Sequence, residues 1–218
     1  MSEIILNNLI QRYPSLTSCQ DDILLMYSLL KSTYENGNKL LVAGNGGSCA
    51  DADHIVGELM KGFCSDRKIN DAIKQNIKNA TDSNEDAEYL CAKLQGALPV
   101  ISLHSQSSLL TATLNDIDSD IVYAQSMLGY GKKGDCFLAI STSGNSRNVL
   151  LACIVAKSIG VKVIGLTGAN GGKLKEVADV CVCVSETETY KIQELHLPIY
   201  HAVCLMLEKS FFTDTEEI

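Results

Sequence analysis

Several features are absent from this 218-residue sequence, and each absence excludes a class of protein. There is no basic tract and no interleaving of basic with aromatic residues, and the net charge is −8, so nucleic-acid binding is not expected. No apolar run approaches the roughly 18 residues needed to span a bilayer, so no membrane association is expected. There is also no repeat or low-complexity tract, and 46% of the residues are hydrophobic. The chain is therefore predicted to form one domain over residues 1–218.

The nine cysteines include no Cys-x-x-Cys pair and form no pattern of metal ligands. Cys181 and Cys183 flank one residue in a segment predicted to be a buried strand. The odd number of cysteines, and the lack of a signal peptide after Met1, are typical of a reducing compartment where cysteines pack as small apolar side chains. A cytoplasmic location is therefore expected.

Five short runs rich in Val, Ile and Leu are predicted to be buried strands, at residues 39–43, 98–103, 136–140, 161–166 and 180–184. Longer amphipathic segments alternate with them, which is typical of a parallel α/β sheet with helices on both faces. Two helices are predicted before the first strand, at 3–12 and 19–35. The second has more apolar residues than one buried stripe requires, so it is expected to cover a neighbouring subunit as well as its own sheet.

The interval 67–96 differs from the rest of the chain, because it is polar and carries only a weak helical pattern around 87–94. We interpret it as a partly helical insertion before the second strand. It lies close in sequence to the candidate site residues described below. It is therefore a candidate cover for that site.

The first candidate binding element is Gly44-Asn45-Gly46-Gly47-Ser48, which follows a strand and opens a helix. Glycines permit positive φ and close approach of the backbone to a ligand, and a helix N-terminus favours an anion. Such local binding makes a phosphorylated substrate compatible with an acidic chain. The third glycine of a dinucleotide-binding motif is missing. A tight turn without a ligand is the alternative interpretation.

A second loop, residues 141–146, follows the third predicted strand and precedes a helix expected to begin near Asn145. It offers four hydroxyl groups, on Ser141, Thr142, Ser143 and Ser146. Helix capping needs only one hydroxyl, so we favour phosphate binding over capping alone. A third glycine-rich turn, 167–172, is expected to bind the same ligand or only to close a turn. All three loops follow strand ends, where open α/β sheets bind ligands.

Two pairs of side chains suggest chemistry beside these loops. His54 and Glu58 are four residues apart, and Gln193 and His201 are eight apart, so each pair lies roughly on one side of a helix. Each alone has an ordinary explanation, as a surface hydrogen bond or a core histidine. Their occurrence with two phosphate-type loops favours a metal site or an acid/base pair beside a phosphosugar. We expect His196 to support the site from behind, and His104 to pack or cap.

Together these motifs resemble those of the bacterial phosphoheptose isomerases of the sugar isomerase (SIS) fold group. The matching segments are Gly44 to Ser48, Asp51 to His54, Glu58-Leu59, Asn115-Asp116, Ser141 to Ser146, Leu166 to Gly168, Gly171-Gly172, and Ile192 to His196 with His201. They occur in the order and spacing of the family. The resemblance covers nearly the whole chain except residues 67–96.

The resemblance implies an α/β fold, with a five-stranded parallel sheet in a flavodoxin-like three-layer sandwich (the SIS domain) preceded by N-terminal helices. It implies a homotetramer that shares residues between subunits and interconverts sedoheptulose 7-phosphate with D-glycero-D-manno-heptose 7-phosphate or a related aldose. One zinc ion per subunit is implied, on the residues that match His54, Glu58, Gln193 and His201. Glu58 and His201 are also implied as the catalytic residues. Those implied to bind substrate are Asn45, Gly46, Gly47, Ser48, Asn115, Asp116, Ser141, Thr142, Ser143, Ser146 and Gln193.

Aldose–ketose isomerisation needs a base that moves a proton between neighbouring carbons, and a group that steadies the enediolate oxygens. Glu58 suits the base and His201 suits the acid that shuttles the hydroxyl proton. A zinc ion would instead polarise both oxygens. Residues bound tightly to zinc are less free to carry protons, so both assignments stay open at this point.

Three residues depart from the family pattern. Gln106 stands where an aspartate is common, and an amide cannot act as a base. Lys191 replaces a common arginine and weakens any bidentate contact. Pro198 is expected to interrupt and kink the last helix, which would re-aim His201. These departures and the insertion affect the choice of substrate more than the type of reaction.

Two alternative functions follow from the same motifs. One is a non-catalytic SIS protein that binds a phosphosugar or a partner, as the replication-initiator-binding relatives do. Those relatives lose the glutamate and histidine pair, which this chain keeps as Glu58 and His201. The other is an isomerase for a different ketose phosphate.

Overall fold

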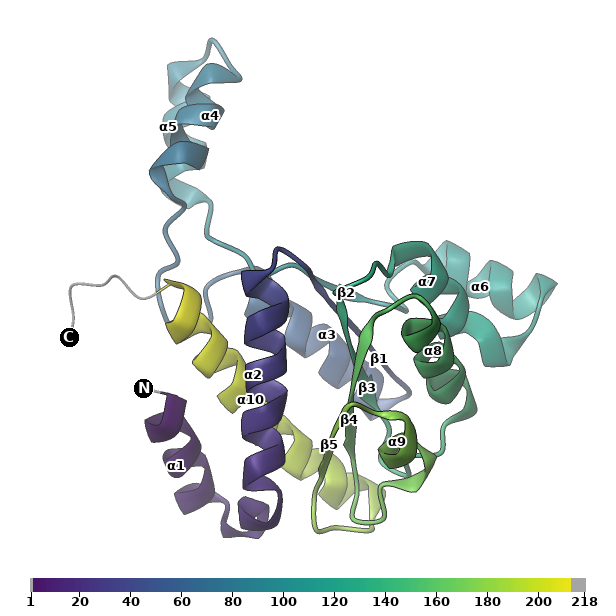
Figure 1. The fold of residues 1–218 in the computed structure, drawn as a ribbon. Coiled ribbons are helices and arrows are strands. Elements are labelled where there is room, and N and C mark those ends of the chain that lie inside the picture. Colours follow the sequence, from purple (N-terminus) through teal and green to yellow (C-terminus); the bar gives the residue numbers. More distant parts are fainter. Residues whose placement is uncertain (1, 213–218) are drawn as a thin grey trace.

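The sheet of this protein is fully parallel. The structure is a computed structural model and describes residues 2–212. Its strands are β1 (Leu40–Gly44), β2 (Val100–Ser102), β3 (Cys136–Ile140), β4 (Lys162–Thr167) and β5 (Val180–Cys183). They lie in the order β2-β1-β3-β4-β5, the flavodoxin-like order, as Figure 1 shows. The predicted fold is therefore confirmed, with strand ends that differ from prediction by one or two residues.

The two faces of the sheet are covered by separate groups of helices. Leu40 and Val42 of β1 join one apolar core, whereas Leu41 and Ala43 join the other, because successive strand residues point to opposite faces. The first face packs against α1 (Ser2–Arg12), α2 (Gln20–Glu35), α3 (Gly47–Met60) and α10 (Thr189–Phe212), and the second against α7 (Val122–Tyr130), α8 (Arg147–Ser158) and α9 (Gly172–Val177). Every residue of β1 and β3 is buried, which explains their continuous apolar runs.

The N-terminal helices agree with the prediction to within one residue at either end. A 3₁₀ helix, η1 (Pro14–Cys19), connects them. On α2, Ile23, Met26 and Leu30 are buried in the core, while Leu25 is 54% exposed. This helix therefore carries apolar surface that its own sheet does not cover.

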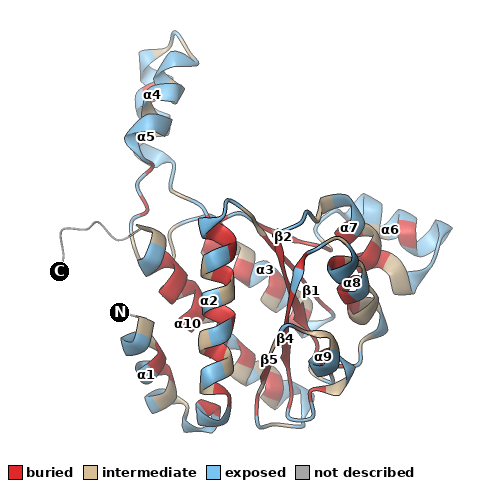
Figure 2. Ribbon diagram, viewed as in Figure 1, coloured by how far each residue is buried: buried red, intermediate tan, exposed pale blue. Residues whose placement is uncertain are grey.

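The insertion forms an arm, residues 69–94, that projects from the body (Figure 1). It consists of α4 (Asp71–Asn79) and α5 (Asn84–Lys93), capped by the side chains of Asn70 and Ser83. An antiparallel bridge between Lys68 and Gln95 closes its base. Most of the arm is exposed, as Figure 2 shows in pale blue. The pattern at 87–94 overlaps α5, and α4 has no counterpart in the sequence prediction.

The last helix, α10, runs without interruption from Thr189 to Phe212, so the expected break at Pro198 is wrong. Pro198 removes one amide donor, which costs the Glu194 carbonyl its helical partner. The Glu194 side chain is exposed, whereas Pro198 itself is buried. No described helix combines the length and apolar content that a membrane span requires.

Candidate functional site

The first loop connects β1 to α3 through glycines that other residues would not replace without strain. Gly46 has a φ of 57°, in the left-handed region that favours glycine. A Cβ atom at Gly44 would lie 2.6 Å from the carbonyl oxygen of Ser48, and one at Gly47 would lie 2.5 Å from Nε2 of Gln193. Gln193 therefore packs against the start of α3. This explains how the first loop meets the last helix.

The second loop uses its hydroxyl groups in different ways. Ser143 Oγ accepts a hydrogen bond from the Asn145 amide at 3.1 Å, so it caps the turn. Ser141 Oγ and Ser146 Oγ lie 2.9 Å apart and share one hydrogen bond. Thr142 is half-buried and its carbonyl accepts a bond from the third glycine-rich turn. The following helix, α8, begins at Arg147 rather than near residue 145.

The third glycine-rich turn supports the second loop. The Leu174 amide donates to the Gly144 carbonyl at 2.9 Å, and the Gly168 amide donates to the Thr142 carbonyl at 3.0 Å. Gly144 has a φ of 65°, and a Cβ there would overlap the Gly171 carbonyl. The close approach of these two loops therefore explains the glycines at 144 and 172, since a Cβ at Gly172 would lie 2.5 Å from the Ser143 carbonyl oxygen.

Two residues that the sequence did not suggest tie the first loop to its neighbours. The Asn45 and Asn148 side-chain amides exchange two hydrogen bonds, at 2.9 and 3.0 Å. The Tyr123 hydroxyl donates to the Gly44 carbonyl at 2.6 Å. Burial, with the nearby Cys49, raises the pKa of Tyr123 to about 12, so it stays a donor at neutral pH. These contacts border an open polar hollow of about 470 Å³, which is lined in part by Asn45, Tyr123, Ser146 and Arg147.

Helices α3 and α10 bring together two imidazoles and one carboxylate from distant parts of the chain. His54 Nε2 lies 3.1 Å from Glu58 Oε1 and 3.4 Å from His201 Nε2. We call these three residues the His–Glu–His cluster. Burial and the neighbouring His54 lower the pKa of His201, and Glu58 opposes this in part. His201 is therefore neutral near pH 7, as a metal ligand or proton acceptor must be.

A second pair of polar side chains lies behind His54. The Tyr200 hydroxyl lies 3.0 Å from His54 Nδ1 and donates to Asp51 Oδ1 at 3.2 Å. The pKa of Asp51 is raised above its ordinary value because the side chain is buried. The hydrogen bond from Tyr200 and the proximity of His54 oppose this rise in part. Burial and the Asp51 charge also raise the pKa of Tyr200.

The cluster has the donor atoms of a zinc site and part of its geometry. Zinc–nitrogen bonds of about 2.0–2.1 Å in a tetrahedral site place neighbouring ligand atoms roughly 3.3 Å apart. The distances of 3.1 and 3.4 Å around His54 Nε2 agree with that spacing. Among residues 2–212, however, no group of three His, Cys, Asp or Glu side chains forms a preassembled metal site. Gln193 lies beside Gly47, two helical turns before His201, and among residues 2–212 no hydrogen bond joins it to the cluster.

Other residues singled out from the sequence lie elsewhere. Asn115 and Asp116 bond to each other at 2.8 Å on the exposed end of α6 (Ser107–Asp116), which projects from the sheet and leads to η2 (Ser119–Ile121) (Figure 1). His104 Nε2 lies 2.9 Å from Asp53 Oδ1. Gln106 is exposed next to α6. The structure does not bring Asn115, Asp116 or Gln106 to the cluster.

Two further candidate residues lie on α10, and neither contacts the cluster. His196 is completely buried, and neither ring nitrogen has a hydrogen-bond partner among the described residues. Lys191 Nζ lies 2.6 Å from Glu188 Oε1 on the surface. His196 is therefore part of the core behind the loops and does not contact the cluster.

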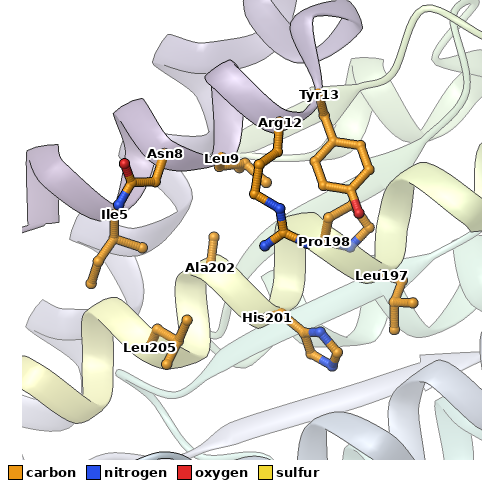
Figure 3. Close-up of a pocket in the computed structure, with 10 residues that line it drawn as sticks. All are labelled: Ile5, Asn8, Leu9, Arg12, Tyr13, Leu197, Pro198, His201, Ala202 and Leu205. Carbon is orange, nitrogen blue, oxygen red and sulfur yellow. The ribbon is translucent and has the colours of Figure 1, made fainter.

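A groove between α1 and α10, shown in Figure 3, borders one member of the cluster. His201 lines this groove, which has a volume of about 360 Å³. Arg12 extends from α1 toward α10 (Figure 3) and also stacks over Tyr13, 5.4 Å from its ring centroid. The remaining lining is mainly apolar: Ile5, Leu9, Leu197, Pro198, Ala202 and Leu205, with Asn8.

Comparisons with known proteins agree with this architecture. The SIS domain family model matches residues 80–168. The phosphoheptose isomerase of Akkermansia muciniphila is 33% identical over 215 residues, which cover 97% of this chain and 99% of that protein. That of Aneurinibacillus thermoaerophilus is 38% identical over 179 residues, or 82% of this chain and 76% of that protein.

Solved structures give the same result. The phosphoheptose isomerase from Neisseria gonorrhoeae superposes with a TM-score of 0.72 at 28% identity, covering 93% of this chain and 94% of that one. The enzyme from Francisella tularensis gives a TM-score of 0.73 at 27% identity with the same coverage. The resemblance found in the sequence is confirmed, and the chain belongs to the phosphoheptose isomerase family.

Proposed function

We propose that this protein interconverts sedoheptulose 7-phosphate and D-glycero-D-manno-heptose 7-phosphate through an enediolate. The observation that carries the proposal is the convergence of Glu58 and His201, 143 positions apart in the sequence, on His54. A carboxylate and a neutral imidazole are the groups that this reaction needs. Their occurrence in a member of the phosphoheptose isomerase family supports catalysis over binding alone.

Each group of the cluster has a defined task in this proposal. The Glu58 carboxylate takes the proton from one carbon and returns it to the next. His201, kept neutral by burial, accepts and passes on the hydroxyl proton. A zinc ion held by His54, Glu58 and His201 would supply a Lewis acid for the two sugar oxygens. Gln193, two turns earlier on α10, a residue from another subunit or water would complete that ligand set.

The two loops supply the binding site for phosphate in this proposal. Backbone amides at the start of α3 and hydroxyls of the second loop, chiefly Thr142 and Ser143, suit phosphate oxygens. Ser48 and His54 are six residues apart on α3, or about 9 Å along its axis at 1.5 Å per residue. That span favours a long sugar phosphate over a triose phosphate.

We further propose that the protein is a homotetramer. The α1–α10 groove beside His201 and the exposed Leu25 of α2 both offer apolar surface to a second copy. A second copy on this surface would shield the reaction from water and add residues to the site. Light scattering should give four times the monomer mass of 23.6 kDa.

The direct test is incubation of zinc-loaded protein with sedoheptulose 7-phosphate, followed by identification of the product. Glu58→Gln and His201→Ala should each lower kcat by about 10²- to 10⁴-fold. Lys162→Gln, at the exposed first residue of β4, serves as the control. Sugar binding without turnover at full zinc content would replace the proposal with a binding function. Turnover of six-carbon ketose phosphates alone would refute the substrate but keep the reaction.

A further inference from the structure

A line of three hydrogen-bonded side chains, Asp51, Tyr200 and His54, leads into the His–Glu–His cluster. We infer that Tyr200, anchored by Asp51, is a positioning residue that directs Nε2 of His54 at Glu58 and His201. This inference rests on the proposed function, because it assigns Tyr200 a task in the same site. It concerns residues that do not themselves touch substrate.

The direction of the hydrogen bonds gives the first argument. A tyrosine hydroxyl has one proton, and Tyr200 donates it to Asp51 Oδ1 at 3.2 Å. The hydroxyl oxygen then accepts from His54 Nδ1, 3.0 Å away. With this direction His54 donates from Nδ1, and its Nε2 lone pair is available to a proton or a metal ion held between it, Glu58 and His201. Only this tautomer offers Nε2 as a ligand or an acceptor.

The packing around Tyr200 gives the second argument. Its side chain is 1% exposed and makes edge-to-face contacts with both imidazoles. Its ring centroid lies 5.5 Å from that of His54 and 5.0 Å from that of His201. These contacts restrict rotation of His54 and support the orientation set by the hydroxyl.

The state of Asp51 gives the third argument. Oδ2 of Asp51 is buried and has no hydrogen-bond partner among the described residues. An unsatisfied buried oxygen is unfavourable for folding. Asp51 also has no described ion pair, and its hydrogen bond goes to Tyr200. The buried Asp51 carboxylate therefore lowers stability, and its hydrogen bond is made to Tyr200. This is consistent with a role for Asp51 in orienting Tyr200.

Tyr200→Phe separates positioning from packing, because it keeps the ring and removes only the hydroxyl. The first measurement is the ¹⁵N spectrum of His54 in the full-length, metal-free protein at alkaline pH, where imidazole is neutral. Glu58 Oε1, 3.1 Å from Nε2, favours the Nε2–H tautomer, so the two tautomers compete. Wild type should show a larger Nδ1–H fraction than Tyr200→Phe. Asp51→Ala removes the acceptor, which frees the Tyr200 hydroxyl to donate to His54 Nδ1, so it should change the tautomer in the same direction as Tyr200→Phe.

The second measurement is zinc affinity, by competition with a chromophoric chelator. Loss of a group that orients a metal-binding histidine typically weakens binding by about 10- to 100-fold. Tyr27→Phe is the matched control, since it also removes a part-buried hydroxyl bonded to α10, at Ser210 Oγ. Its His54 tautomer and zinc affinity should not change.

An unchanged His54 tautomer in Tyr200→Phe, with zinc affinity within twofold of wild type, would overturn the inference. The tautomer measurement requires neither zinc nor substrate. It therefore stays informative even if the protein proves inactive on heptose phosphates, so the two failures are distinguishable.

Discussion

Among the four histidines, His196 is the one that has lost all contact with solvent. Its side chain is completely buried in the core, whereas His54, His104 and His201 each approach a polar side chain. Burial lowers the pKa of His196 to about 4, an effect that the nearby Thr167 backbone partly opposes. In the unfolded chain the same imidazole titrates near 6.5. Protonation therefore favours the unfolded state.

The sign of this shift predicts a loss of stability on acidification. The contribution of His196 is complete above pH 6.5 and declines as the pH falls toward 4, by at most about 3 kcal/mol. Urea unfolding of wild type at pH 7 and pH 5 measures the decline. His196→Leu lacks this imidazole, so its stability should decline less on acidification. Some decline should remain because other groups still titrate. Equal declines in the two proteins would show that His196 is not the sensitive group.

A second residue-scale prediction concerns Gly144. Its left-handed backbone and its contact with the Gly171 carbonyl leave no room for a Cβ. Gly144→Ala should therefore destabilise the protein by about 1–2 kcal/mol or more, and should weaken phosphosugar binding through the second loop. Gly57→Ala is the control, since Gly57 lies within α3 with open space around it. That change should stabilise the protein by about 0.5–1 kcal/mol in urea unfolding.

At the scale of elements, a buried ion pair joins the ends of α3 and α10. Arg67 Nε donates to Glu208 Oε1 at 2.7 Å, and its other nitrogens donate to the carbonyls of Leu59 and Glu58. Glu208 also accepts the Phe63 amide at 2.8 Å. Burial raises the pKa of Glu208, but these hydrogen bonds and the Arg67 charge outweigh burial. The pKa of Glu208 is therefore lowered overall. The pair thereby caps the helix that carries Glu58.

Breaking this pair on one side should be costly. Glu208→Gln leaves Arg67 buried without its counter-charge, so we expect a loss of about 3–5 kcal/mol in urea unfolding. Arg67→Met with Glu208→Leu should recover part of the loss, because neither charge remains. Full recovery is not expected, since backbone groups of Leu59 and Phe63 would lose their partners. A loss below 1 kcal/mol for the single variant would contradict the buried charge pair.

The sheet and its loops could be predicted because their signals are local. The runs that form β1 and β3 are apolar throughout, as full burial on both faces requires. Only Val100–Ser102 pairs at the edge of the sheet, so β2 is shorter than its apolar run. Helix α4 has no described buried residue. The spacing of Ile73 and Ile77 does indicate an amphipathic helix, but the polar composition of the segment obscured that signal. The predicted interruption at Pro198 was wrong because the backbone hydrogen bonds of the neighbouring turns keep α10 helical.

The site was only partly accessible to sequence reasoning. The spacing of His54 and Glu58 places them on one face, whereas their meeting with His201 depends on how α3 packs on α10. Asp51 belongs to a segment that matches the family, but nothing in the sequence links it to Tyr200, since a hydroxyl in an apolar helix is ordinary. The place of Gln193 against Gly47 also follows from helix packing, which no spacing rule encodes.

At the scale of the whole molecule, the arm and the body are structurally separate. The two apolar cores on either side of the sheet contain no residue of α4 or α5. The arm exposes Ile73, Tyr89, Leu90 and Leu94, each at least 38% accessible. A pair of short helices with such exposure gains little stability from its own packing. The body should therefore fold without it.

Replacing residues 70–93 by Asn-Gly tests this separation. The Lys68–Gln95 bridge places Ile69 opposite Leu94, so a two-residue turn should connect them without strain. We expect the free energy of unfolding to stay within about 1 kcal/mol of wild type, because both cores are retained, and zinc affinity to be unchanged. Leu41→Ala, fully buried in the sheet, should lose about 2–5 kcal/mol and calibrates the assay. An unfolded product would show that the arm is part of the body. A folded product of lower oligomeric mass would instead assign the exposed apolar residues of the arm to contacts between subunits.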